Sequence, residues 1–166
     1  NAYTLSVDGI DFNGKAEKSV TEHSYNMLCE ALEINRENIV KPHQTHTDCI
    51  KNVDNNFQKT SKEYLENVDG LLTSKPNTDL VLSFADCTPI LLYDPVKNII
   101  GNIHSGWRGT AQEIGQKAVL KMIKDYGSKP EDIIACIGPC IGKCHFEVDE
   151  DVKNIFEQAF SYLNRN

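Results

Sequence analysis

Apolar residues along the chain fall into short groups whose spacing predicts alternating helices and strands. Helical spacing appears in residues 19–32, 110–127 and 150–163. The first two segments open with a capping-box pattern, a Ser or Thr followed three residues later by Glu, and Gly127 marks the end of the second. The three apolar stripes are Val20, Met27, Leu28, Ala31 and Leu32, then Ala111, Ile114, Ala118, Met122 and Ile123, then Val152, Ile155, Phe156, Ala159 and Phe160.

Other apolar runs have the length of buried strands. We expect a strand over 38–53, interrupted near Pro42, and shorter ones at 80–84, 90–93, 99–104 and 133–137. Residues 94–98 have the composition of a turn, so the strands on either side should form a hairpin. Because hairpins are mixed with strand–helix alternation, the pattern predicts an α+β fold with a mixed sheet.

The composition limits the classes of protein to consider. A length of 166 residues suits one domain, 1–166. A net charge of −7 argues against a broad grip on nucleic acid, and no apolar run is long enough to span a membrane. The first residues do not resemble a signal peptide, so we expect a cytoplasmic protein whose six cysteines are reduced. The sequence does not determine an oligomeric state.

Three segments place a metal-seeking side chain where a predicted strand ends, at His46, Cys87 and His104. Two imidazoles and a thiolate make a three-ligand zinc set that leaves a fourth position for water or substrate. The spacing matches no contiguous zinc motif. A buried thiol and two hydrogen-bonded histidines are therefore the alternative interpretation.

A second group of metal-seeking residues is Cys136, Cys140, Cys144 and His145. It resembles part of a zinc deaminase site, but the order of its elements is reversed and the cysteine spacing is one residue too long. Small apolar packing around a tight loop is the alternative, with Cys136 inside a strand and directed into the core.

The segment Ser105 to Gly109 places Arg108 between a strand and a helix. Main-chain N–H groups at such a junction favour anions, and the guanidinium fork suits phosphate or carboxylate. A local turn with an ion-paired arginine is equally compatible. Asp69 is interpreted as an Asx turn before Gly70, with an acid–base role as the alternative, and Asp86 as a support for Cys87.

Taken together, these motifs resemble the YfiH-like laccase-domain family, whose members are labelled polyphenol oxidases and are better understood as purine nucleoside phosphorylases. The motifs occur in the family's order over about residues 39–152. They are Gln44-Thr45-His46, Val68-Asp69-Gly70-Leu71-Leu72-Thr73, Ala85-Asp86-Cys87-Thr88-Pro89, His104-Ser105-Gly106-Trp107-Arg108-Gly109, Gly138-Pro139-Cys140-Ile141-Gly142 and Glu147-Val148.

The resemblance implies a four-layered αββα sandwich with mixed β-sheets, and zinc rather than copper on His46, Cys87 and His104. It also implies cleavage of purine nucleosides by inorganic phosphate, with adenosine deamination as a companion activity. We expect these three residues and Arg108 to be catalytic, with Arg108 on the phosphate. The family usually has an Arg- and Gly-containing segment before the first helix, which we do not find ahead of Ser19, and it normally continues beyond the helix that is expected to end near Leu163.

Three other functions remain open at this stage. A copper polyphenol oxidase is disfavoured because five histidines cannot supply a blue-copper centre and a trinuclear cluster together. A Cys-His hydrolase would use Cys87 as nucleophile with His46 or His104 as base. A non-catalytic, zinc-stabilised interaction module is the third alternative.

Overall fold

The computed structural model describes residues 9–12, 16–54 and 63–164, and the chain divides into two compact units, 1–39 and 40–166. The first unit contains helix α1 (Lys18–Leu32). Its packing centres on Tyr25, which is buried and stacks under the guanidinium of Arg36 at 3.7 Å. The predicted helix is confirmed, but it begins after Glu17 without a side-chain cap, so the predicted capping box does not form. The prediction of one domain over 1–166 stays a prediction.

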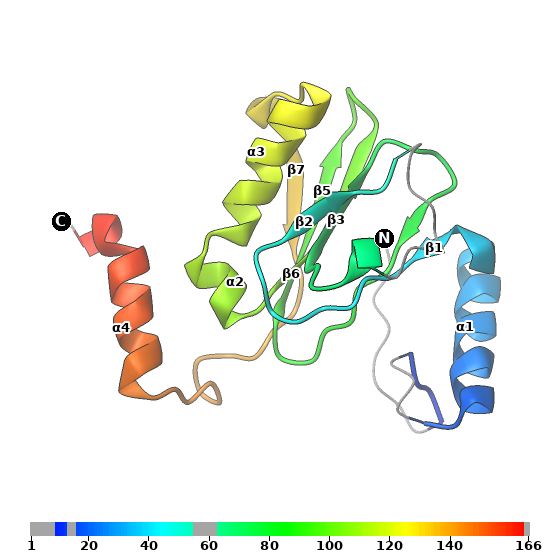
Figure 1. Cartoon of the computed structure of the whole chain (residues 1–166), viewed down its shortest axis with the longest axis horizontal. Coiled ribbons are helices and arrows are strands. Elements are labelled where there is room, and N and C mark those ends of the chain that lie inside the picture. The colour runs from blue at the N-terminus through cyan, green and yellow to red at the C-terminus, as the bar shows by residue number, and fades with distance from the viewer. Residues whose placement is uncertain (1–8, 13–15, 55–62, 165–166) are drawn as a thin grey trace. The chain divides into compact units, whose positions relative to one another are not determined.

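The second unit is built on a five-stranded sheet in the order β2-β3-β6-β5-β7 (Figure 1). Strands β2 and β3 are parallel and the other neighbours are antiparallel, so the predicted mixed sheet is confirmed. A two-stranded sheet pairs β1 with β4. The strands are β1 (Ile39–Val40), β2 (Ile50–Asn52), β3 (Gly70–Thr73), β4 (Asp79–Leu80), β5 (Thr88–Asp94), β6 (Ile99–Ser105) and β7 (Ile134–Ile137).

The predicted hairpin is the β5–β6 pair. The Asp94 carboxylate accepts hydrogen bonds from the N–H groups of Val96 and Lys97, which closes the turn. The pairing then runs from Asp94 opposite Ile99 to Thr88 opposite Ser105. This register brings the start of β5 beside the end of β6, which is where the candidate site lies.

Helices α2 (Trp107–Ala111) and α3 (Ile114–Tyr126) cover one face of the sheet (Figure 1). They are two helices, because Glu113 adopts a left-handed conformation (φ 58°) between them. The predicted capping box therefore fails here too: the Thr110 hydroxyl lies inside α2, where it bonds the Gly106 carbonyl. Gly127 (φ 69°) ends α3 as predicted. The core on this face contains Leu72, Leu92, Ile99, Ile103, Ile114, Ala118 and Met122.

A second core lies on the other face of β3. Successive residues of a strand point to opposite sides, so Leu72 packs under α3 while Leu71 joins the second core. That core contains Val40, Val53, Val68, Leu71 and Leu82. Helices on one face of a mixed sheet and a second, smaller sheet confirm the α+β class.

Several predicted elements differ in the structure. The expected strand over 38–53 is only β1 and β2, with a loop over 41–49, and residues 81–84 are not a strand. Helix α4 (Glu150–Ala159) ends earlier than expected and contains no fully buried residue. Strand β7 is exposed along its whole length, so Cys136 is not directed into a core. Within the described part of the chain, no helix has the length and apolar character that a membrane span requires.

Candidate metal centre

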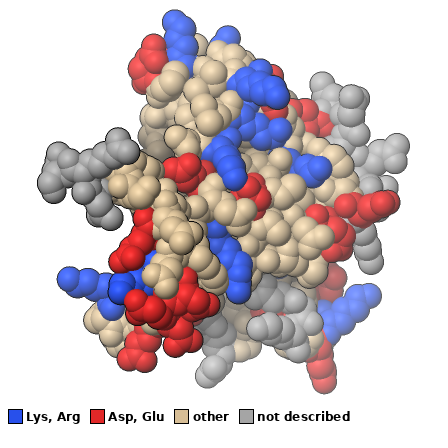
Figure 2. All heavy atoms as spheres, turned by 60° about the vertical axis from the view of Figure 1, so that its left-hand side comes forward, with Lys and Arg blue, Asp and Glu red and all other residues tan. Residues whose placement is uncertain are grey.

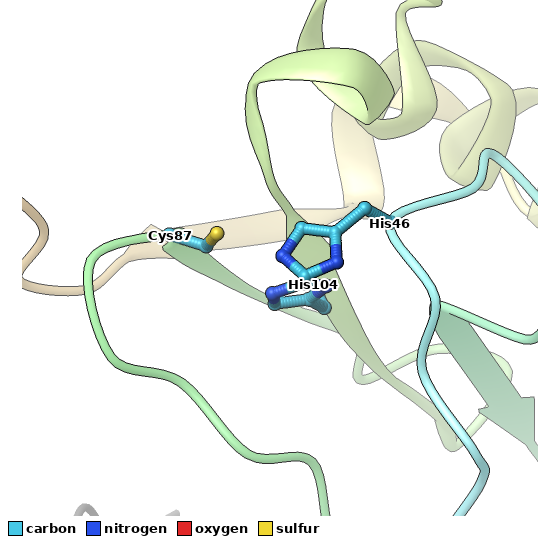
Figure 3. Close-up of side chains that lie close together, drawn as sticks. All are labelled: His46, Cys87 and His104. Atoms are coloured by element: carbon cyan, nitrogen blue, oxygen red, sulfur yellow. The ribbon is translucent and has the colours of Figure 1, made fainter.

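The structure brings together the three side chains predicted as zinc ligands. One ligand atom from each of His46, Cys87 and His104 lies within 4.8 Å of the others. Figure 3 shows the sulfur of Cys87 facing the two imidazole rings. His46 comes from the β1–β2 loop, Cys87 from the residue before β5, and His104 from β6. The ligands of one tetrahedral zinc ion stand roughly 3.3–3.8 Å apart, so small side-chain movements would suffice.

Asp69 fixes the orientation of one of these rings. Its Oδ1 lies 2.7 Å from Nδ1 of His104, and both side chains are buried. Because an ionised carboxylate can only accept hydrogen bonds, Nδ1–H of His104 donates to it, and Nε2 of the neutral imidazole then carries a lone pair that can bind a metal. A carboxylate behind a histidine in this way is the usual support of a metal-binding imidazole.

The same carboxylate also holds the loop that carries His46. It accepts hydrogen bonds from the N–H groups of Thr45, His46 and Thr47 and from the Thr47 hydroxyl. His46 adopts a left-handed conformation (φ 64°), which is uncommon for a residue with a side chain. The loop is therefore wrapped around one buried anion. Burial alone would raise the pKa of Asp69, but the hydrogen bonds from His104, Thr47 and Thr45 outweigh it and lower the pKa to about 2.

Gly106 leaves the space between the three donors open. A Cβ atom at this position would lie 2.8 Å from Cδ2 of His46, 3.2 Å from Sγ of Cys87 and 3.7 Å from Cε1 of His104. The backbone of Gly106 (φ −71°) is compatible with any residue, so the requirement for glycine is one of space.

The electrostatic surroundings of Cys87 do not suit a free nucleophile. Burial raises the pKa of the Cys87 thiol, and the nearby carboxylates of Asp86 and Asp69 raise it further. Nucleophilic cysteines instead have a lowered pKa, set by a neighbouring cation or a helix N-terminus. A bound divalent cation would favour the thiolate, so the negative surroundings fit a cation site better than a Cys-His pair.

The other predicted site residues are placed as follows. Arg108 is exposed, and its guanidinium stacks on the Trp107 ring at 4.2 Å. Its predicted role on phosphate stays a prediction. Among the described residues, the second cysteine cluster does not form a three-donor group: Cys136, Cys140 and Cys144 are exposed, and only Cys144 contacts His145. That alternative metal site is therefore not formed.

The sequence interpretation missed the role of Asp69. We expected an Asx turn, yet the carboxylate is fully buried and bonds to groups 22 to 35 residues away in sequence. A signal was present, since an aspartate between Val68 and the apolar run of β3 must be buried and must therefore find partners.

The fold and the site define a class: a mixed-sheet α+β protein with an open His-Cys-His group of the kind that holds a transition metal. The chain belongs to the laccase-like family described as multi-copper polyphenol oxidoreductase laccase, whose sequence model matches residues 9–165. Among the described residues there is one three-donor group, which is enough for one ion.

Curated proteins and a solved crystal structure that resemble this chain agree with its assignment to this family. A purine nucleoside phosphorylase of Bacteroides thetaiotaomicron is 37% identical over 148 residues, which are 87% of this chain and 54% of that protein. Adenosine deaminase RL5, from an unknown prokaryotic organism, is 31% identical over 99% of this chain and 63% of its own length. The crystal structure of YfiH from Bacillus licheniformis superposes with a TM-score of 0.81 at 34% identity, over 87% of this chain and 56% of that one. The chain thus spans between 54% and 63% of the length of these relatives.

Proposed function

We propose that this chain carries the metal centre of a zinc-dependent purine nucleoside phosphorylase, with adenosine deamination as a companion activity. The observation that carries the proposal is the convergence of His46, Cys87 and His104 around the space kept open by Gly106. The names of the curated relatives support it. Zinc bound there would supply a Lewis acid able to polarise the purine or a water molecule.

The donor set fits zinc on structural grounds. The hydrogen bond to Asp69 orients His104, and three N and S donors with an open fourth position are typical of catalytic zinc sites. The same three donors would also fit a single copper ion, but His43 and His145 lie elsewhere: His43 pairs with Glu66 and His145 with Cys144. The remaining histidine, His23, is exposed on α1. A multi-copper centre would need further histidines at the site.

Phosphorolysis requires an anion close to the sugar. A phosphate oxygen forms a bond to C1′ of the ribose while the C1′–N9 bond breaks, and the base leaves with that electron pair and gains a proton. Arg108 is our candidate for the phosphate, since its planar fork can donate two hydrogen bonds to one anion. It lies two residues beyond Gly106, and its stacking on Trp107 holds the guanidinium at the surface.

The test is to incubate the metal-analysed protein with inosine or adenosine, with and without phosphate. We expect free base and ribose 1-phosphate only when phosphate is present, loss of the reaction with a chelator, and recovery with zinc. Cys87→Ser should abolish turnover and zinc binding. The matched change Cys136→Ser, at an exposed thiol, should leave both unchanged.

Other results would identify the alternatives. Free ribose without phosphate would indicate hydrolysis, and covalent trapping of Cys87 in the presence of chelator would indicate a cysteine nucleophile. Oxidation of phenols by the copper-loaded protein would favour the oxidase. Zinc binding without turnover, together with loss of cooperative unfolding in Cys87→Ser, would indicate a structural module.

A further inference from the structure

The three candidate ligands come from three segments of the chain, so three separations must be fixed for them to meet at one ion. Cys87 lies directly before β5, and His104 lies in β6. The two strands pair with Thr88 opposite Ser105. The register of this hairpin therefore sets the separation of Cys87 from His104. His46 lies in a loop outside the two strands (Figure 3).

Asp69 fixes a second separation. Its Oδ1 atom lies 3.1 Å from the main-chain nitrogen of His46 and 2.7 Å from Nδ1 of His104. One carboxylate oxygen thus links these two ligands directly. Neither this oxygen nor the hairpin joins His46 to Cys87, which is the remaining separation.

The side chain of Gln44 joins the two segments that carry His46 and Cys87. Its Nε2 donates to the carbonyl of Ser83 at 2.9 Å, and its Oε1 accepts from the N–H of Ser83 at 2.8 Å. Gln44 lies two residues before His46, and Ser83 lies four residues before Cys87. Both groups of the amide are therefore used on one residue of the other segment.

The position of Gln44 along the two segments explains why an amide side chain is needed. Strand β1 pairs with β4, and the N–H of Val81 donates to the Val40 carbonyl at 3.0 Å just beyond them. Further along, the amide of Gln44 serves in place of a main-chain peptide opposite Ser83, because it carries both a donor and an acceptor. Ordering a long side chain costs conformational entropy, so two hydrogen bonds to one residue indicate a fixed link.

The segment that contains Ser83 also contacts a second ligand. The next residue, Phe84, has its ring centroid 5.5 Å from that of His104, with the two rings inclined at 53°. Phe84 packs against the second core as well. This segment is therefore anchored to the core on one side and to Gln44 on the other.

We infer that Gln44 is a positioning residue of the metal centre and that it sets the separation of His46 from Cys87. The inference rests on the metal centre of the proposed function but not on phosphorolysis. The donor atoms lie within 4.8 Å of one another, and a tetrahedral ion needs them roughly 3.3–3.8 Å apart. Without the link, the His46 loop should move away from Cys87 and leave the ion with fewer protein ligands.

The test is to titrate the full 166-residue chain with Co²⁺, which takes the place of zinc in tetrahedral sites and, unlike zinc, absorbs visible light. Gln44→Met keeps the length of the side chain but removes its donor and its acceptor. We expect the affinity for Co²⁺ to fall roughly 10- to 100-fold. At saturating Co²⁺, the visible bands of a tetrahedral ion and the near-ultraviolet band of a bound thiolate should weaken per bound ion, because water replaces a protein ligand.

The spectrum separates positioning from a general effect on the fold. A change that merely destabilises the chain lowers the affinity and leaves the spectrum of the bound ion as it was. Gln112→Met is the matched control, because Nε2 of Gln112 also donates to a main-chain carbonyl, that of Arg108, at 3.2 Å. This control should leave both the affinity and the spectrum unchanged.

Two further measurements support the comparison. In the metal-free chain, hydrogen exchange at the Ser83 amide should be faster in Gln44→Met and unchanged in Gln112→Met, because only the first loses the link. If Gln44→Met does not unfold cooperatively in urea, Gln44→Glu takes its place. Glutamate keeps the acceptor but turns a carboxylate oxygen towards the Ser83 carbonyl, so the tetrahedral bands should weaken in this variant too.

Three results would overturn the inference. The first is an affinity and band intensities in the Gln44 variants equal to those of the unaltered chain. The second is a weakening of equal size in Gln112→Met. The third is an unaltered chain that binds no Co²⁺. Because turnover is not the readout, a chain that responds as expected but does not cleave inosine would contradict the proposed function and leave the role of Gln44 standing.

Discussion

The Asp69 carboxylate and the His104 imidazole form a buried pair, with Oδ1 2.7 Å from Nδ1 and side chains 0% and 4% exposed. The same carboxylate binds the main chain of the loop that carries His46. One side chain, on the residue immediately before β3, thus sets the position of two of the three candidate ligands. The geometry of the site therefore depends on a residue that does not itself offer a ligand.

Replacing Asp69 with Asn should weaken both the fold and the metal site. The amide presents N–H donors where the carboxylate accepts bonds from Thr45 and Thr47, so at least one buried donor is left unpaired. We expect a loss of about 1–3 kcal/mol in the free energy of unfolding. Zinc affinity, measured by competition with a chromophoric chelator, should fall roughly 10- to 100-fold.

The control for this change is Asp86→Asn, the same substitution at an exposed carboxylate beside Cys87. It should alter the unfolding free energy by no more than about 0.5 kcal/mol. An Asp69→Asn variant that binds zinc as tightly as the unaltered chain would show that the carboxylate does not position the ligands.

Two glycine-to-alanine substitutions should have opposite effects. Gly106→Ala fills the space among the three donors without backbone strain, so zinc binding should be lost while the fold persists. Gly127→Ala adds a Cβ that meets nothing within 4 Å but forces a side chain into φ 69°, so stability should fall by about 1 kcal/mol with zinc binding intact. Isothermal titration with zinc and urea unfolding separate these outcomes. Equal zinc affinity in both variants would contradict the assigned role of Gly106.

Stability at alkaline pH should depend on Tyr126. Burial and the hydrogen bond to the Asp54 carboxylate raise the pKa of this phenol above its ordinary value of 10.0. The folded chain therefore holds the proton more tightly than the unfolded chain. The resulting stabilisation is complete below pH 10 and is lost as the pH rises beyond it.

The measurement is the urea midpoint between pH 8 and pH 11. Tyr126→Phe should lower the urea midpoint at pH 8, because the hydrogen bond to Asp54 is lost. Above pH 10, the midpoint of this variant should fall less steeply with pH than that of the unaltered chain. Tyr93→Phe, at an exposed tyrosine, should follow the unaltered chain. If Tyr126→Phe shows the same alkaline slope as the unaltered chain, the titration of this phenol is not responsible.

The sequence predicted the elements that local patterns define. Helix α1, the β5–β6 hairpin and the end of α3 at Gly127 follow from apolar spacing and turn residues, and strand ends pointed to His46, Cys87 and His104. Features that depend on distant partners were missed. The burial of Asp69 could be expected from its apolar neighbours, but its partners lie 22 to 35 residues away in sequence, and apolar spacing does not identify them. The left-handed residue Glu113 interrupts a segment whose apolar spacing predicted one helix.

The exposure of β7 and α4 was missed for a related reason. Their apolar patterns predict burial, but a pattern along the chain does not show which other segments lie over these residues. The net charge predicted a surface without a broad basic region. On the face drawn in Figure 2, basic side chains lie scattered among acidic ones, in keeping with the net charge of −7.

Arg108→Lys tests whether the guanidinium fork binds phosphate. Lysine keeps the positive charge but can neither donate two parallel hydrogen bonds nor stack as flatly on Trp107. If Arg108 binds phosphate in the proposed reaction, the KM for phosphate should rise roughly tenfold, with the KM for inosine and the zinc content nearly unchanged. Arg36→Lys is the matched control, since Arg36 also stacks on an aromatic ring, that of Tyr25, in the other unit of the chain. Arg36→Lys should lower the free energy of unfolding and leave the KM for phosphate, the KM for inosine and the zinc content unchanged. A rise of equal size in both KM values for Arg108→Lys would mean that the arginine acts on the whole site, not on the anion.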